Sequence, residues 1–233
     1  MSTIAGNLQA VEATIQVACE AAGRPRSTVQ LLAVSKTFPA EAVLEAVAAG
    51  QRAFGENYLQ EGVDKIAAVA KALPDTRLEW HFIGPIQSNK TRPIAASFDW
   101  VHTVERLKIA QRLSEQRPPE LGPLNICLQV NISGEASKSG VTPDELPALA
   151  QAVAALPNLR LRGLMAIPEP QIDPELQRVP FARLRELAQD IVKSGIHLDT
   201  LSMGMSSDMR AAVLEGASIV RVGSAIFGAR HYE

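Results

Sequence analysis

The sequence is poor in the residues that metal sites and disulfide frameworks require. Its two cysteines, Cys19 and Cys127, are far apart and form no C-x-x-C pair, so neither a disulfide framework nor a zinc ribbon is indicated. The four histidines include no pair at i,i+4 spacing and no H-E-x-x-H motif. We therefore expect no structural or catalytic metal.

Charge of one sign and long apolar runs are also missing. The formal net charge is -2, which gives no electrostatic basis for a nucleic-acid or anionic-membrane partner. No basic stretch precedes an apolar core at the N-terminus, and no segment is apolar over a membrane-spanning length. We expect a cytoplasmic protein. Because the pattern shows no exposed apolar stripe, we also expect a monomer.

Strand-like and helical segments alternate along almost the whole chain. A helix is expected at residues 3–22, followed by eight apolar strand-like runs at residues 29–35, 52–54, 78–83, 100–103, 125–131, 160–166, 200–203 and 219–222. Regular alternation predicts a parallel sheet. Eight units without a linker fit one domain, residues 1–233, folded as a closed (β/α)₈ TIM barrel with an extra N-terminal helix. A doubly wound open sheet is the alternative, although LLAVSKT lacks the glycine fingerprint expected after its first strand.

Polar residues follow several of the expected strands. In a (β/α)₈ barrel the site is assembled where strands end and loops begin. The expected strand ends supply Lys36, Asn57, His81, Thr103, Asn131, Met165, Met203 and the run 221–223. Lys36 directly follows an apolar strand, and its simplest interpretation is a rim lysine whose ammonium reaches water.

The loops after the seventh and eighth strands have the composition of a phosphate site. Gly204 permits a tight turn and Ser206 follows it near the start of a helix, while Gly223 permits close backbone approach and Ser224 begins a short helix. Two helix N-termini side by side attract an anion. The alternative is that the serines are ordinary helix caps. Asp208 would repel a phosphate unless its carboxylate faces away.

Arg221 lies inside an apolar strand, on the same face as Ile219 and Gly223. A buried guanidinium needs an acceptor. That acceptor is either a carboxylate of the barrel, Glu79 or Glu56, or the nitrogen of a bound heteroaromatic ring.

A lysine, a phosphate site and a cation facing a ring nitrogen together indicate a pocket for pyridoxal 5′-phosphate (PLP), with Lys36 as the Schiff-base residue. Asn57 and His81 would line the ring or its hydroxyl, or each is a satisfied polar residue in the core. No catalytic residue and no metal ligand is assigned.

Seven segments, in order along nearly the whole chain, carry a resemblance to a known family. They read AVSKTFP, FGENYLQE, WHFIGPIQSNK, VNISGEASKSG, LRGLMAIP, LSMGMSSDM and VRVGSAIFGAR. With these segments the chain resembles the YggS/PROSC family of pyridoxal phosphate homeostasis proteins.

The resemblance implies a fold like the N-terminal barrel of alanine racemase and a cofactor site. It implies that Lys36 holds PLP as a Schiff base and that Arg221 faces the pyridine nitrogen. It further implies that Ser206, Gly223 and Ser224 bind the phosphate. Asn57 and His81 would lie in the pocket beside the ring. The resemblance also implies a role as a carrier or buffer of PLP that supports vitamin B6 and amino-acid homeostasis. PLP-dependent apoenzymes are the candidate partners.

Two enzyme functions remain as alternatives, a single-domain PLP-dependent racemase and a Schiff-base aldolase without cofactor. In racemases with a similar barrel, a second domain brings a tyrosine to the opposite face of the ring. This chain ends at Glu233, and of its two tyrosines Tyr58 follows a pocket residue while Tyr232 lies near the end. We therefore expect no robust catalysis.

Two further lysines could take part in cofactor transfer. Lys138, in the loop NISGEASKSG on the expected active face, is either a secondary amine that receives the cofactor or a solvated loop lysine. Lys90 is a weaker candidate of the same kind.

Overall fold

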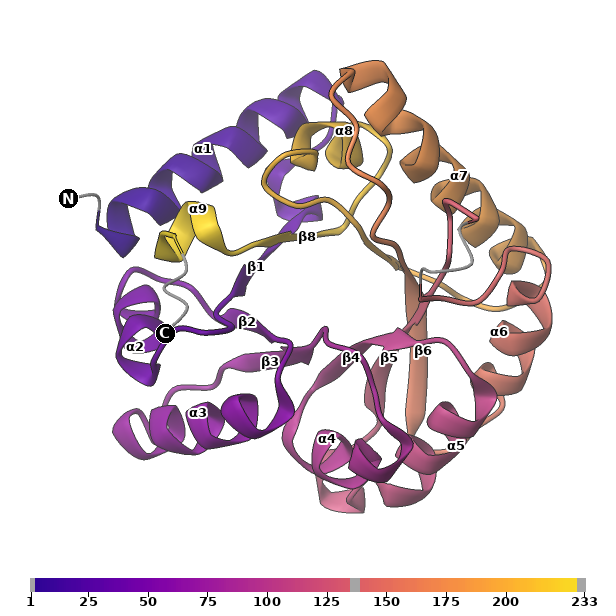
Figure 1. The fold of residues 1–233 in the computed structure, drawn as a ribbon, viewed down its shortest axis with the longest axis horizontal. Helices are drawn as coiled ribbons and strands as arrows, with labels where there is room; N and C mark the ends of the chain where they lie inside the picture. Colours follow the sequence, from indigo (N-terminus) through magenta and orange to yellow (C-terminus); the bar gives the residue numbers. More distant parts are fainter. Residues whose placement is uncertain (1–2, 135–138, 230–233) are drawn as a thin grey trace.

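Eight parallel strands close into a barrel in the structure, a computed structural model that describes residues 3–134 and 139–229. The strands are arranged in sequence order, and β8 pairs with β1 to complete the ring (Figure 1). Their bounds are β1 (Gln30–Val34), β2 (Ala53–Glu56), β3 (Glu79–Phe82), β4 (Trp100–Val104), β5 (Leu124–Gln129), β6 (Leu159–Met165), β7 (Thr200–Ser202) and β8 (Ile219–Val222).

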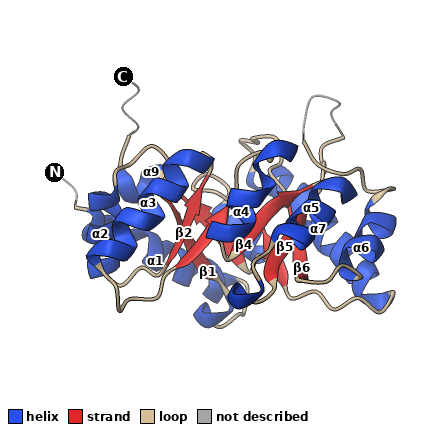
Figure 2. Cartoon of the chain, turned by 90° about the horizontal axis from the view of Figure 1, so that it is seen from below, coloured by secondary structure: helices blue, strands red, loops and turns tan. Residues whose placement is uncertain are grey.

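Helices surround the barrel on its outside (Figure 2). Those of the described residues are α1 (Ile4–Ala21), α2 (Ala40–Ala48), α3 (Leu59–Ala72), α4 (Thr91–Ser97), α5 (Leu107–Gln116), α6 (Leu146–Ala154), α7 (Pro174–Lys193), α8 (Met209–Leu214) and α9 (Ser224–Phe227). None of these helices combines the length and apolarity that crossing a membrane requires.

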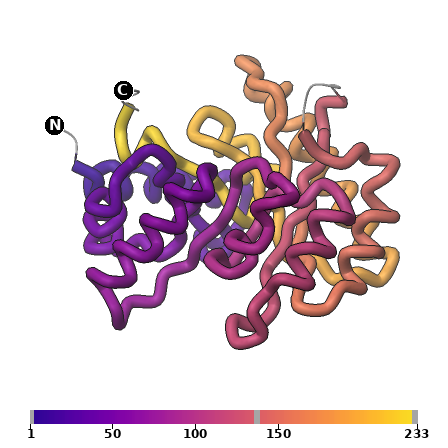
Figure 3. Tube along the Cα trace, turned by 60° about the horizontal axis from the view of Figure 1, so that its bottom comes forward, coloured from indigo at the N-terminus to yellow at the C-terminus, as the bar shows by residue number. Residues whose placement is uncertain are grey.

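The extra N-terminal helix packs beside the end of the chain. Helix α1 contacts α8 and α9, and Figure 3 shows the first and last described segments side by side. The Asn7 side chain donates a hydrogen bond from Nδ2 to the Ile226 carbonyl at 2.8 Å. This helix, the eight strands and the closed barrel are confirmed, so the open-sheet alternative is excluded.

Several strands are shorter than the sequence predicted, among them the one expected at residues 125–131. The run 125–131 was expected to be extended throughout, but β5 ends at Gln129. Val130 still donates its N–H to the Met165 carbonyl of β6 at 2.9 Å, but its bridge is with Val141, and Asn131 donates its N–H to the Val141 carbonyl at 2.9 Å. The chain leaves the sheet after Val130 because the backbone partner of Asn131 is a loop segment rather than β6.

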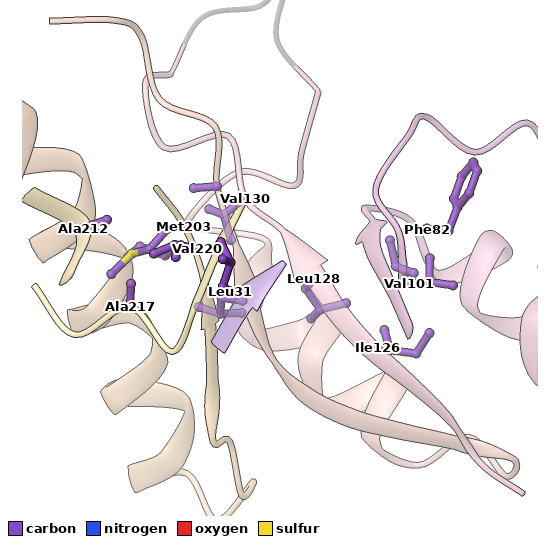
Figure 4. Close-up of a cluster of buried hydrophobic side chains, with 14 of the residues drawn as sticks. Leu31, Phe82, Val101, Ile126, Leu128, Val130, Met203, Ala212, Ala217 and Val220 are labelled. Atoms are coloured by element: carbon purple, nitrogen blue, oxygen red, sulfur yellow. The ribbon is translucent and has the colours of Figure 1, made fainter. Parts of the chain in front are cut away.

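Apolar side chains form two separate cores, one on each side of the barrel wall. Leu31 and Ala33 belong to the large outer cluster between the strands and the helices, whereas Leu32 and Val34 belong to a smaller cluster inside the barrel. This division follows the period-two alternation of strand side chains. Figure 4 shows part of the outer cluster, where Met203 lies near Ala212.

An exposed apolar row lies at the start of α7, where the sequence analysis recognised no such stripe. Ile172, Leu176 and Val179 are 100%, 52% and 63% exposed. Leu176 and Val179 are three residues apart and share one side of the first turns, Ile172 precedes the helix, and the buried face of α7 is formed further along, from Phe181 onward. The monomer was expected because no exposed apolar stripe was recognised, and that reason no longer holds. The monomer stays a prediction.

Strands β6 and β7 approach each other closely at Gly163. This residue pairs with Thr200, next to a register shift between β5 and β6. A Cβ atom added at Gly163 would lie 1.7 Å from the Thr200 carbonyl oxygen. Only glycine fits here without moving a backbone strand of the barrel.

We predict that Gly163→Ala lowers the free energy of unfolding by roughly 3 kcal/mol, since the methyl group must separate two paired strands. Gly6→Ala is the matched control, because a Cβ at Gly6 would meet only Thr3 Oγ1, at 3.2 Å. The control should change the unfolding free energy by less than about 1 kcal/mol. Chemical denaturation measures both, and equal effects would contradict the close approach.

Candidate functional site

Lys36 lies at the carboxyl end of the barrel, two residues beyond the last residue of β1. It continues the spacing of Leu32 and Val34, which face the barrel interior. The residue is half-buried. Sites in this fold form at this end of the strands.

Buried polar groups fix the backbone immediately before Lys36. The Ser35 hydroxyl donates to Glu56 Oε1 at 2.6 Å, and Lys65 of α3 donates from Nζ to the Ser35 carbonyl at 2.7 Å and to Glu56 Oε1 at 2.6 Å. Burial raises the pKa of Glu56, and the charge of Lys65 opposes that rise. Both the carbonyl and the side chain of Ser35 are thus held from outside the barrel.

The backbone immediately after Lys36 is held by the same cluster of side chains around Lys65. Thr37 donates its N–H to Glu61 Oε1 at 2.6 Å, and Glu61 also accepts from Lys65 Nζ at 2.8 Å. Thr37 adopts φ 68°, a left-handed conformation that costs a β-branched residue energy. We refer to Ser35, Thr37, Glu56, Glu61 and Lys65 as the Lys36 clamp.

Arg221 of β8 is a buried cation inside the barrel, 5% exposed. It donates from Nη1 to Ser202 Oγ at 2.8 Å and from Nη2 to the Ala166 carbonyl at 3.0 Å. Burial lowers the pKa of its guanidinium to about 10, so the group is charged at neutral pH. Both of these acceptors are neutral, and guanidinium N–H groups remain for a ligand.

The two carboxylates proposed as partners of Arg221 do not contact it, so that alternative was wrong. Glu56 faces outward from β2 and bonds to Lys65. Glu79 does face inward, but it is the first residue of β3, and it bonds to His81 instead.

The two loops proposed to hold a phosphate lie next to each other, after the paired strands β7 and β8. Gly204 has φ 95°, which favours glycine. A Cβ at Gly223 would lie 3.1 Å from the Val34 carbonyl oxygen of β1. Ser206 and Ser224 are both exposed, one in each loop. The first N–H groups of α9 have no intrahelical acceptor.

Asp208, the carboxylate that could repel a phosphate, is bonded within its own loop. Its Oδ1 accepts the Met205 N–H at 2.6 Å. Burial raises the pKa of Asp208, while its loop bond and the charge of Arg221 lower it. The carboxylate therefore serves the turn that carries Ser206.

Asn57 follows β2 at the same end of the barrel and has an unused acceptor. A Cβ at Gly84 would lie 2.0 Å from the Asn57 carbonyl oxygen, and Thr103 Oγ1 donates to the Gly84 carbonyl at 2.6 Å. The Asn57 Oδ1 atom is buried and bonds to no other described residue. A cavity of ≈ 440 Å³ lies beside it and is lined by residues that include Ile83 and Gln129.

His81 lies deeper than the mouth. It is fully buried, with Nε2 at 2.8 Å from Glu79 Oε1 and Nδ1 at 2.8 Å from His102 Nε2. Both ring nitrogens have protein partners. Of its two proposed roles, the satisfied core residue fits this position, and a direct contact with a ligand stays an untested prediction.

Two polar residues of the barrel interior, His102 and Ser202, were not predicted from the sequence. His102 and Ser202 connect His81 to Arg221 inside the barrel, and the sequence signal for them is a polar residue among apolar neighbours of a buried strand. Lys138 and Tyr232 lie outside the described residues. Lys90 is exposed at the end of a short 3₁₀ turn (Ser88–Lys90).

The residues at the mouth fit PLP. Arg221 offers donors to a ring nitrogen, Asn57 Oδ1 is an unsatisfied acceptor, and the glycine-containing loops offer hydroxyl and backbone N–H groups to a phosphate. Lys36 is the amine at the end of β1. Together these residues provide an amine, a cationic donor, an acceptor and an anion-binding pair of loops for the cofactor.

Comparisons with known proteins agree with this fold and site. The family described as "Alanine racemase, N-terminal domain" matches residues 6–231. A pyridoxal phosphate homeostasis protein of Pseudomonas aeruginosa is 66% identical over 232 residues, covering 100% of this chain and 98% of that protein.

Solved structures give the same assignment. PipY of Synechococcus elongatus, solved with PLP bound, is 38% identical with a TM-score of 0.83, covering 97% of this chain and 100% of PipY. An alanine racemase of Corynebacterium glutamicum is 20% identical with a TM-score of 0.65, covering 97% of this chain and 62% of the racemase; this likeness shows the fold alone. The chain therefore belongs to the alanine racemase N-terminal domain family and, within it, to the pyridoxal phosphate homeostasis proteins.

Proposed function

We propose that this protein binds PLP at the carboxyl end of its barrel and carries or buffers the cofactor in support of vitamin B6 and amino-acid homeostasis. The observation that carries the proposal is the buried Arg221 guanidinium, which donates to two neutral acceptors among the described residues and lies on the strand that leads to Gly223 and Ser224. The printed names of its relatives, and the PLP bound in PipY, support the same ligand.

Each residue of the site has a role in this proposal. Lys36 supplies the amine that attaches the cofactor, Arg221 donates to the ring nitrogen, and Ser206, Gly223 and Ser224 bind the phosphate. Asn57 accepts a hydrogen bond at the ring. When bound, PLP supplies an aldehyde that reacts reversibly with amines and a ring that can withdraw electrons.

Arg221 favours a carrier over a catalyst. A guanidinium gives up its proton with difficulty even when its pKa is lowered to about 10. Its partner nitrogen is then held as an acceptor without a proton, which weakens electron withdrawal by the ring. The residues thus favour retention of the cofactor over chemistry on it.

Two alternatives remain distinguishable from the carrier by simple observation. A Schiff-base aldolase would use Lys36 on a sugar phosphate and would stay colourless when PLP is added. A racemase would bind PLP and turn over. Transfer to PLP-dependent apoenzymes, a role for Lys138 as a secondary amine, and a cytoplasmic location stay predictions.

We predict that Lys36→Ala abolishes covalent attachment of PLP, because it removes the amine beside the phosphate loops, while weaker non-covalent binding persists. Borohydride reduction followed by peptide mass spectrometry locates the attachment. Lys90→Ala, which removes an exposed lysine, is the control and should retain the full adduct. An adduct found mainly on Lys90 or Lys138 in the unmodified sequence would refute the assignment of Lys36.

We predict that Ser224→Asp weakens PLP binding by on the order of 2 kcal/mol, because it places a carboxylate against the phosphate in a partly desolvated site. Calorimetric titration with PLP and with pyridoxal separates the phosphate contribution. Pyridoxal lacks the phosphate and should be much less affected, and Ser224→Ala should have the smaller effect on PLP. Equal loss of both ligands would mean that the substitution had disrupted the site as a whole.

We predict that the protein of 233 residues does not racemise alanine at an enzymatic rate. Racemisation needs an acid/base group on each face of the α-carbon, and Lys36 serves one face; Tyr58, the tyrosine among the described residues, is 51% exposed. Losing one such group typically costs about 10²–10⁴-fold. Chiral chromatography of L-alanine incubated with PLP-loaded protein measures the rate. Turnover of roughly 1 s⁻¹ or faster that requires Lys36 would establish the racemase instead.

A further inference from the structure

A continuous chain of polar side chains, all of them buried except Glu79, crosses the interior of the barrel and ends on Arg221. Arg221 Nη1 donates to Ser202 Oγ at 2.8 Å, and Ser202 Oγ lies 2.7 Å from His102 Nδ1. His102 Nε2 lies 2.8 Å from His81 Nδ1, and His81 Nε2 lies 2.8 Å from Glu79 Oε1. We refer to these five residues as the interior chain. It links β8, β7, β4 and β3.

The two ends of the interior chain fix the direction of its hydrogen bonds. At one end, Glu79 is a carboxylate that can only accept, because its bond to His81 and its other contacts lower its pKa to about 2. Glu79 Oε1 also accepts from Gln30 Nε2 at 2.8 Å. The hydrogen between Glu79 and His81 must therefore be carried by His81 Nε2.

The neutral imidazoles of His81 and His102 determine the direction of the remaining hydrogen bonds. Burial lowers the pKa of both His81 and His102, so each ring carries one N–H at neutral pH. With Nε2 of His81 protonated, its Nδ1 is an acceptor, and the donor to it is His102 Nε2. His102 Nδ1 is then an acceptor as well, and the hydroxyl hydrogen of Ser202 is donated to it.

The other end of the chain agrees with this assignment. A guanidinium has only donors, so Ser202 Oγ accepts from Arg221 while it donates to His102. Every bond thus points from Arg221 toward Glu79. Hydrogen bonds aligned in one direction polarise each other, and the chain joins a buried cation to a carboxylate that it does not touch.

Resting on the function proposed above, we propose that Ser202 and His102 are positioning residues for the cofactor ring. They hold the Arg221 guanidinium in one orientation, with its remaining N–H groups presented to the ring nitrogen. The second fixed point is the Ala166 carbonyl, which accepts from Nη2 at 3.0 Å. Without Ser202 the guanidinium would keep a single anchor, and without His102 the Ser202 hydroxyl would lose its acceptor and be free to rotate.

The test compares PLP with an analogue in which carbon replaces the ring nitrogen. The variants are Ser202→Ala and His102→Leu, with Cys127→Ala as control, because Cys127 is also buried in the barrel interior but forms none of the interior-chain bonds. Calorimetric titration should show PLP binding about tenfold weaker in both chain variants, as expected for a disturbed bond to a charged group. The analogue should bind all four proteins within about twofold, and PLP should bind the control as it binds the unmodified protein.

Each outcome is decisive. Equal loss of PLP and analogue in the chain variants, or no loss of either, would overturn the positioning role. A failure of the unmodified protein to bind PLP would instead refute the proposed function. If His102→Leu fails to fold, Ser202→Ala, which removes a single oxygen, carries the comparison.

A second measurement needs no cofactor. ¹⁵N NMR of histidine-labelled protein at neutral pH should show His81 and His102 both neutral, with the hydrogen on Nε2 in each. A hydrogen on Nδ1 of His102 would reverse its bond to Ser202 and overturn the proposed direction of the chain.

Discussion

The pairing of β1 with β8 is the contact on which the rest of the molecule depends. Gln30 to Ala33 align with Ile219 to Val222, and this ladder turns a row of strands into a closed ring. It also brings the lysine that follows the first strand next to the loop that follows the last one. Gly223 completes the approach, because its missing side chain lets the backbone meet Val34 of β1. The proposed amine and phosphate groups thus come together only when the fold is complete.

Closure also buries the side chains of the barrel interior, and a charge inside it must be compensated. The cation of Arg221 is placed there with neutral hydrogen-bond acceptors, while the Asp208 carboxylate acts on it only through space, and desolvation of such a group is expensive. Two neutral acceptors bind it directly, and oriented dipoles connect it with the opposite end of the barrel. Trp100 stacks on His81 at 5.3 Å between ring centroids, so the polar chain is also in contact with an aromatic side chain of the barrel interior.

The sequence predicted the barrel, because strand periodicity and the order of elements are local signals, and from the barrel it placed the candidate site at the carboxyl ends of the strands. It also predicted that Arg221 faces inward. It did not predict the partners of Arg221. Side chains alternate along a strand, so the arrangement that turns Asn57 toward the mouth turns Glu56 away from it. Glu56 could therefore not be a partner of Arg221, and the sequence alone was enough to predict this. The link through Ser202 and His102 was not, because it depends on how β4, β7 and β8 are staggered around the ring.

The Lys36 clamp has a consequence for which amine meets a reactive aldehyde. A carbonyl compound condenses with the lone pair of a free amine and not with an ammonium ion. Lys65 bonds to the residue that precedes Lys36, and its Nζ donates to the Ser35 carbonyl, Glu56 and Glu61. An ammonium engaged with three acceptors has no lone pair to offer. The clamp therefore occupies the ammonium of Lys65 while it fixes the backbone on both sides of Lys36, so this buried lysine has no lone pair to offer to a carbonyl compound.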